Sequence, residues 1–307
     1  MSRRISRVAA FAVCLVGPSV LSGQASATAY AQYVPGNTAP PPNCGTTSAK
    51  IGTNTAQAAA NCVGGTGLFD ARASSNRGQI KAFASASVTN NASTGQQQRW
   101  QAFGSASWND QLVVTSGTQT PSFLQFVLRI SGALSASASG TGCGYGIEQS
   151  SYYFSAAGGV TDQWNSPQNF GARSGPNCYN NFQPLLQQGS TSLRTMFTNT
   201  YLIPIVSGAA KFGYSMNTAS FLLADPTSSA SLSLDAIGDF EHTIDVVGIN
   251  LLGQNGADIT NQVVFSFVNG TQLSPTVTAP EPTTLALVTL GALVLAVARR
   301  RRTRAAE

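Results

Sequence analysis

The chemistry open to this chain is limited by its single histidine. His242 is the only imidazole among 307 residues, so a Ser-His-Asp or Cys-His arrangement would have to use it. The surrounding sequence, Asp239-Phe240-Glu241-His242-Thr243, matches no local motif of serine hydrolases, zinc peptidases or phosphate-binding loops. We therefore predict that His242 lies at a strand end, bonded to a neighbour, and that the protein is not an enzyme and uses no cofactor.

Asp239 and Glu241 leave one enzymatic alternative open. Glycosidases use two carboxylates, which need not be close in sequence. Two positions apart on a strand, these side chains would share one face. The expected interpretation is a pair of solvated acids at a turn, and a polysaccharide-modifying hydrolase remains the weaker alternative.

Cysteines predict disulfides rather than a metal site. Cys44, Cys62, Cys143 and Cys178 remain once Cys14 is removed with a predicted signal peptide. Four cysteines allow three connectivities, and pairing Cys44 with Cys62 and Cys143 with Cys178 closes the shortest loops. No Cys-x-x-Cys occurs and there is one histidine, so zinc is not expected and no metal ligand is predicted.

Aromatic and amide side chains near the second predicted disulfide form a possible ligand surface. Trp164, Asn165, Tyr179 and Asn180 lie in or just beyond the loop that Cys143 and Cys178 would close. Aromatic faces and amides together are typical of sugar-binding surfaces. The alternative is that these aromatic residues belong to the core, as most aromatic residues of sandwiches do.

Acidic residues dominate the last quarter of the central region. Residues 212–279 contain no lysine or arginine and six acids: Asp225, Asp235, Asp239, Glu241, Asp245 and Asp258. We expect solvated turns and strand edges there. A calcium site stays an open alternative, although no spacing matches a known calcium loop.

The formal charge of +5 resides at the two ends of the chain. Residues 31–279 carry nine basic and ten acidic side chains, which leaves −1. Both basic clusters flank apolar runs instead of forming a surface patch, so nucleic acid is excluded as a partner.

The N-terminus has the pattern of a secretory signal peptide over residues 1–31. Three arginines, Arg3, Arg4 and Arg7, precede an apolar stretch over residues 8–21, which is too short for a permanent membrane span. Small residues then offer cleavage after Ala27 or after Ala31.

The C-terminus, residues 280–307, has three parts in order. They are the tripeptide Pro280-Glu281-Pro282, an uncharged run over residues 283–298, and the block Arg299, Arg300, Arg301 and Arg302. The run predicts one transmembrane helix in the inner membrane, with the arginines stopping transfer on the cytoplasmic side.

These three parts resemble the sorting signal of PEP-CTERM proteins. The resemblance implies a Gram-negative host that makes extracellular polysaccharide, and a membrane-embedded exosortase that recognises Pro280, Glu281 and Pro282 and processes the tail. It implies transient anchoring, followed by delivery to the cell surface or extracellular matrix. The segment from Asp239 to Thr243 and the Ala/Ser-rich strands are also similar to sandwich domains common in these proteins.

Period-two alternation predicts strands through the rest of the chain. Buried-type residues alternate with polar ones from Ile80 to Val88, from Trp100 to Trp108 and from Phe126 to Leu134. About ten such strands favour an all-β fold, an antiparallel sandwich or jelly roll over residues 61–279, behind a Pro/Ala-rich extended leader over residues 32–60.

The sequence therefore predicts an exported, non-enzymatic envelope or matrix protein linked to extracellular polysaccharide or biofilm. The alternative is a carbohydrate-binding module at the cell surface.

Overall fold

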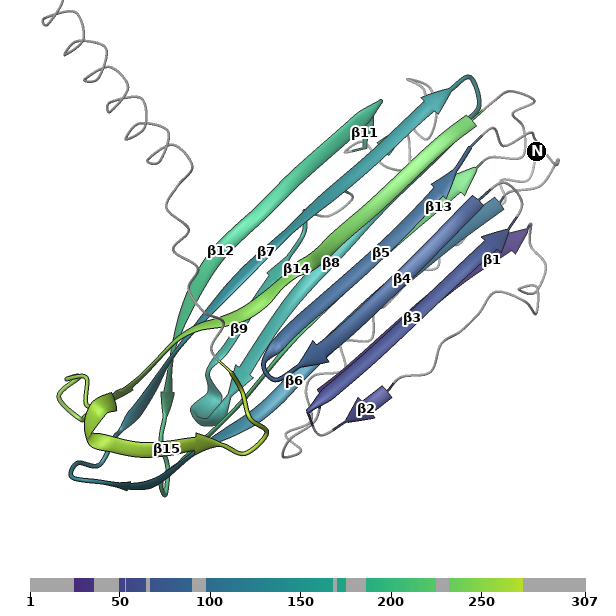
Figure 1. Cartoon of the computed structure of the whole chain (residues 1–307). Helices are drawn as coiled ribbons and strands as arrows, with labels where there is room; N and C mark the ends of the chain where they lie inside the picture. The colour runs from purple at the N-terminus through teal and green to yellow at the C-terminus, as the bar shows by residue number, and fades with distance from the viewer. Residues whose placement is uncertain are drawn as a thin grey trace, which may run out of the picture. The chain divides into compact units, whose positions relative to one another are not determined.

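The computed structural model describes residues 25–35, 50–52, 54–64, 67–89, 98–167, 170–174, 186–224 and 232–272. All of them belong to one compact unit, Met1–Leu273. The second unit, Ser274–Glu307, contains the predicted sorting tail and lies outside the described residues. The predicted all-β class is confirmed, because the unit is built from two packed sheets (Figure 1).

Sheet A has nine strands. Its hydrogen-bonded order is β11 (Gln187–Gln188), β10 (Gly171–Arg173), β8 (Gly144–Ala156), β13 (Ala209–Ala224), β6 (Gln98–Gly117), β1 (Ala25–Pro35) and β2 (Lys50–Gly52). Two more strands join this sheet: β9 (Thr161–Asn165) pairs with β8, and β15 (Val263–Phe267) pairs with β6.

Sheet B has six strands, which cross the front of Figure 1. Their order is β12 (Ser190–Pro204), β7 (Phe123–Gly140), β14 (Leu232–Leu252), β5 (Gln79–Val88), β4 (Gly67–Asn76) and β3 (Thr55–Gly64). Among the described strands every pair is antiparallel except β10 with β11. The helices in this part of the chain are two three-residue 3-10 turns, η1 (Ala157–Gly159) and η2 (Thr260–Gln262).

Alternating burial explains why these segments form strands. On β5, Ile80, Ala82, Ala84, Ala86 and Val88 all point into the core, as predicted. The same alternation holds on β6 and β7, because side chains on a strand point alternately to opposite faces. Strands β6 and β7 both extend well beyond the predicted segments from Trp100 to Trp108 and from Phe126 to Leu134.

Small residues let the two sheets approach closely at one side of the core. Alanines on β1, β3, β4, β5 and β6 face one another across this alanine seam. Gly104 on β6 marks the closest approach, where an added Cβ atom would lie 2.5 Å from the carbonyl oxygen of Phe83 and 2.7 Å from that of Arg72. The backbones of the two sheets are therefore nearly in contact here.

Aromatic residues fill the other side of the core. Phe126 lies 4.4 Å from Phe212 between ring centroids, and Phe154 stacks on Tyr201 at 3.8 Å. Large rings need more space between sheets than alanine does. The core therefore widens from the alanine seam toward its aromatic side.

Strands begin earlier along the chain than the predicted domain boundary at residue 61. Strand β1 pairs with β6 over its whole length, and Ala27, Ala29 and Ala31 are buried. Strand β3 begins at Thr55, inside the predicted leader. The prediction of an extended, unpacked leader is therefore wrong for these segments, because their small residues supply one side of the alanine seam.

Asp110 on β6 holds the end of the described chain. Its carboxylate accepts hydrogen bonds from the backbone N–H groups of Asn269 at 2.8 Å and Thr271 at 3.0 Å, and from both of their side chains. Trp108 also donates from Nε1 to the Thr271 hydroxyl at 2.9 Å. We call this arrangement the Asp110 clamp; it fixes the chain on sheet A just before the tail begins.

Candidate functional site

The outer face of sheet A carries a row of hydroxyl and amide groups. Thr28 on β1, Ser105 on β6, Asn217 on β13, Ser151 on β8 and Asn165 on β9 are cross-strand neighbours in one continuous register. Ser105 donates to Oδ1 of Asn217 at 2.6 Å, and Nδ2 of Asn217 donates to the Ser151 hydroxyl at 3.3 Å. We call this row the hydroxyl–amide ladder.

Neutral residues surround the ladder. The next row contains Ser26 and Ser107, whose hydroxyl oxygens lie 2.6 Å apart, together with Tyr153. On the opposite side Tyr30 faces Phe103, and burial raises the pKa of the Tyr30 hydroxyl above its ordinary value. Uncharged donors and acceptors beside aromatic rings form a surface suited to a neutral hydroxylated ligand.

The structure separates the residues of the predicted ligand surface. Trp164 turns toward the interior, with its ring 5.9 Å from Phe197 and 6.1 Å from Phe240 between centroids. Asn165 is exposed and ends the ladder. Tyr179 and Asn180 lie outside the described residues. Trp164 is thus a packing residue, as the alternative interpretation holds.

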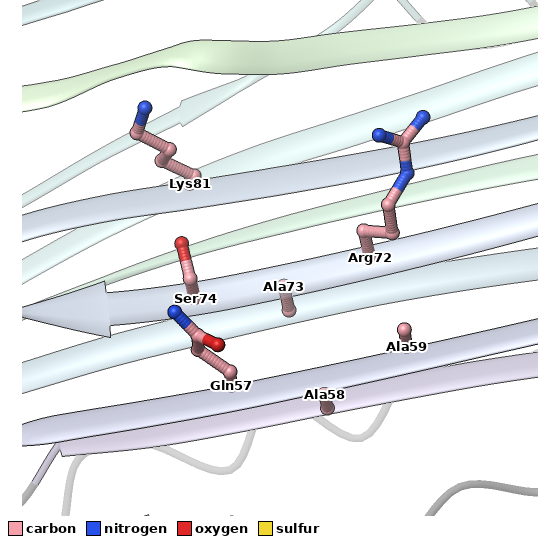
Figure 2. Close-up of a pocket in the computed structure, with 7 residues that line it drawn as sticks. All are labelled: Gln57, Ala58, Ala59, Arg72, Ala73, Ser74 and Lys81. Atoms are coloured by element: carbon pink, nitrogen blue, oxygen red, sulfur yellow. The ribbon is translucent and has the colours of Figure 1, made fainter.

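A shallow hollow of about 410 Å³ lies over β3, β4 and β5. Figure 2 shows Arg72, Lys81, Ser74 and Gln57 standing on one side of these strands. The Arg72 guanidinium lies 4.4 Å above the Phe83 ring and 3.0 Å from the Asp70 carboxylate. Because the Arg72 guanidinium already contacts Asp70 and Phe83, it is less available to an anionic ligand in this hollow than its positive charge suggests.

Glu148 is a buried carboxyl that no motif in the sequence marks. It projects from β8 into the core, where Thr218 donates to Oε1 at 2.7 Å and Ser220 donates to the other oxygen. Loss of hydration raises the pKa of Glu148 well above 4.5, although these hydrogen bonds oppose the rise. Its hydrogen-bond partners are hydroxyl groups inside the core, so we assign Glu148 a structural role there.

The predicted acid pair falls at an irregularity of β14. The register of β14 shifts between Phe240 and Ile244 against β5 and between Asp239 and Ile244 against β7, and the side chains of Glu241 and His242 lie outside the described residues. Asp239 is half-buried beside Phe83. Of the two predicted acids, Asp239 alone therefore has a described side chain.

Other acids of this segment already have protein partners. Asp235 accepts a hydrogen bond from Ser137 at 3.1 Å, and Asp245 pairs with Arg129 at 3.0 Å. Asp258 accepts from the Thr260 hydroxyl and backbone N–H, which lower its pKa. In the described part of the chain no three His, Cys, Asp or Glu side chains come together as a metal site would require.

The two ends that carry the predicted addresses fall largely outside the described residues. These include residues 1–24, Pro280, Glu281, Pro282 and the four arginines from Arg299 to Arg302. No helix formed by the described residues is long and apolar enough to span a membrane.

Comparison with protein families identifies the C-terminal segment. A family model described as the PEP-CTERM protein-sorting motif matches residues 278–302. Comparison with curated proteins gave no match, and comparison with solved structures gave none either. The matched residues contain Pro280, Glu281, Pro282 and the arginine block, in the order that the sequence analysis describes. The chain is therefore a PEP-CTERM motif-containing protein, of the exported kind that an exosortase processes.

Proposed function

We propose that this is a non-enzymatic protein of the cell surface or extracellular matrix, delivered by exosortase processing of its tail and associated with extracellular polysaccharide. The observation that carries this proposal is the sorting motif at residues 278–302, joined to a two-sheet unit. Five residues, 273–277, separate the motif from Gln272, which follows Thr271 of the Asp110 clamp and donates its backbone N–H to the Arg77 carbonyl oxygen at 2.9 Å. The exosortase would therefore act close to a fixed point on the folded unit.

Deleting residues 280–307 tests the delivery step. We expect the truncated protein to escape exosortase processing and to lose its surface or matrix location. The intact mass of the mature protein and fractionation of cells, envelope and medium report both outcomes. Replacing Pro280, Glu281 and Pro282 together by alanine should reproduce the defect while leaving the apolar run in place. Unchanged mass and location in both variants would refute sorting through this tail.

Disulfides are part of the proposal, since an oxidising compartment keeps them formed. We propose the pairs Cys44–Cys62 and Cys143–Cys178. The pairing rests on the short loops that these two bonds would close, and Cys44 and Cys178 lie outside the described residues. Peptide mapping of the unreduced protein should recover these two linked peptides, and four free thiols would contradict the assignment.

A carbohydrate-binding role is the second candidate, favoured by the hydroxyl–amide ladder. A neutral polysaccharide offers hydroxyl groups at regular intervals, which match a row of alternating donors and acceptors on a flat sheet. Tyr30, Phe103 and Tyr153 supply ring surface beside that row. We propose that this face, and not the hollow near Arg72, contacts the polysaccharide.

Affinity electrophoresis in gels containing the host polysaccharide tests this role. The double variant Ser105→Ala, Asn217→Ala should weaken retention by about tenfold, because each lost hydrogen bond contributes about 0.5–1.5 kcal/mol. Ser192→Ala, an exposed serine on sheet B, is the control and should bind as the wild type does. Equal retention of all three proteins would exclude the ladder as the polysaccharide-binding surface. Release of reducing ends from the polysaccharide by the wild type would exclude a non-enzymatic role.

A further inference from the structure

Strand β12 is a long edge strand of sheet B. It pairs with β7 in an unbroken antiparallel register from Ser190 to Pro204, and among the described strands β7 is its only neighbour in the sheet (Figure 1). On the side away from β7, every second residue of an edge strand presents its backbone N–H and C=O groups outward. Such a row of groups is a template for another strand.

The usual protections of an edge are sparse on β12. Proteins block exposed edges with charges, prolines, bulges or short strands. β12 has one charged residue, Arg194, and its proline, Pro204, is at the strand's last position. Its register contains no bulge. On its outer face Met196 is 79% exposed and Leu202 is 52% exposed.

The inner face of β12 holds the strand rigidly. Tyr201 donates a hydrogen bond to Oδ2 of Asp162 at 2.6 Å, and Asn199 donates to the same oxygen at 2.6 Å. The Tyr201 ring stacks on Phe154, and Phe197 packs against Trp164. A strand fixed in this way loses little further conformational entropy when a partner binds.

We propose that β12 pairs antiparallel with β12 of a second copy of this chain, about a two-fold axis at Asn199. In this register Met196 of each copy faces Leu202 of the other, so both exposed apolar side chains are covered. Thr198 faces Thr200, and on the inner side Phe197 faces Tyr201. Arg194 faces Pro204, so no like charges meet.

This register identifies a second copy as the occupant. The strand is complementary to itself, because the apolar residues Met196 and Leu202 lie at equal distances on either side of Asn199. A two-fold contact of this kind closes after two copies. It also joins the two B sheets into one continuous sheet, in which cross-strand side-chain pairs add to the backbone hydrogen bonds.

A charge exchange tests both the interface and its register. In the full chain, kept in detergent solution, the wild type should be dimeric by light scattering coupled to size exclusion. Met196→Lys alone and Leu202→Glu alone should each weaken dimerisation by about tenfold or more, because each places two unpaired charges against an apolar partner. The double variant should restore the dimer, since the introduced ammonium of each copy would then face the introduced carboxylate of the other.

The restoration cannot arise within one chain. Positions 196 and 202 are six steps apart along the strand, about 20 Å, which is too far for a direct ion pair. Val63→Lys is the matched control: Val63 is 74% exposed on β3, the other edge strand of sheet B, and its replacement should leave the dimer unchanged. Near-UV circular dichroism checks that each variant keeps its fold.

Four results would overturn the proposal. They are a wild type that is monomeric at about 100 µM, a double variant that stays monomeric, a dimer that no variant weakens, and open-ended polymers that Val63→Lys abolishes. The last result would instead indicate pairing of β12 with β3 of the next copy.

Discussion

Replacing Gly104 by alanine is expected to push the two sheets apart at the alanine seam. The new methyl carbon would lie 2.5 Å and 2.7 Å from the carbonyl oxygens of Phe83 and Arg72. Carbon–oxygen contacts usually begin at about 3.3 Å, so the sheets must separate by roughly 0.6–0.8 Å at this point. Both oxygens belong to the backbone of paired strands, so no side-chain rotation relieves the contact.

The expected cost follows from this separation. Overpacking a core costs about 1–3 kcal/mol, and a gap of this size removes a quarter to a half of each dispersion contact along the seam. The lower conformational entropy of alanine in the unfolded chain offsets about 0.5–1 kcal/mol. We expect a net loss of about 1–2 kcal/mol in the free energy of unfolding, which lowers the Tm of a unit of this size by about 2–8 °C.

Tryptophan fluorescence during urea unfolding measures this change, because Trp100 and Trp108 are buried on the same strand as Gly104. Gly248→Ala is the control: its new methyl group would lie 3.2 Å from the side chain of Val127, and its effect should stay within about 0.5 kcal/mol. If Gly104→Ala unfolded at the same urea concentration as the control, the close approach of the sheets would be refuted.

Three further predictions concern the clamp, the buried carboxyl and the N-terminus. Asp110→Ala should destabilise the unit by about 2–4 kcal/mol in urea unfolding and should make the segment around Thr271 sensitive to protease, because it leaves buried donors without their acceptor; resistance equal to the wild type would argue against the clamp. Glu148 is protonated in the folded state above pH 4.5, where the unfolded chain ionises, so its contribution to stability declines as pH rises toward the folded pKa. Glu148→Gln should therefore lose less stability than the wild type between pH 4 and pH 8 in thermal unfolding, and parallel curves would contradict this. Of the two predicted cleavage sites, the one after Ala27 should be used, so N-terminal sequencing of the mature protein should begin at Thr28, since cleavage after Ala31 would remove most of β1; a mature chain starting at Gln32 would show that β1 is dispensable.

Strong period-two patterns predict strands correctly, because large buried residues make the alternation easy to detect. On β7, Phe126, Leu128 and Ile130 alternate with polar or half-exposed residues, and the structure buries them as expected. Strands β1 and β3 escape detection because their inward residues are alanines, whose intrinsic preference for strands is low. What stabilises them is the close approach of the opposite sheet, which local sequence does not report.

The candidate surface is harder to predict than the fold. Trp164 and Asn165 are adjacent in sequence, yet neighbouring residues on a strand point to opposite faces, so they cannot share one surface. The ladder brings together residues from five strands spread from Thr28 to Asn217. Its existence depends on the register between strands, and a single sequence gives no direct measure of that register.

The Asp110 clamp has a mechanical consequence for a protein held by its C-terminal end. When flow or a moving neighbour pulls on that end, the force reaches the hydrogen bond from the Gln272 N–H to the Arg77 carbonyl oxygen and then the four hydrogen bonds that Asp110 accepts from Asn269 and Thr271. From there it passes into β6, which pairs with β13 and β1 on its two sides. Tension is thereby spread over the middle of a broad sheet, where many bonds must break together before the unit opens.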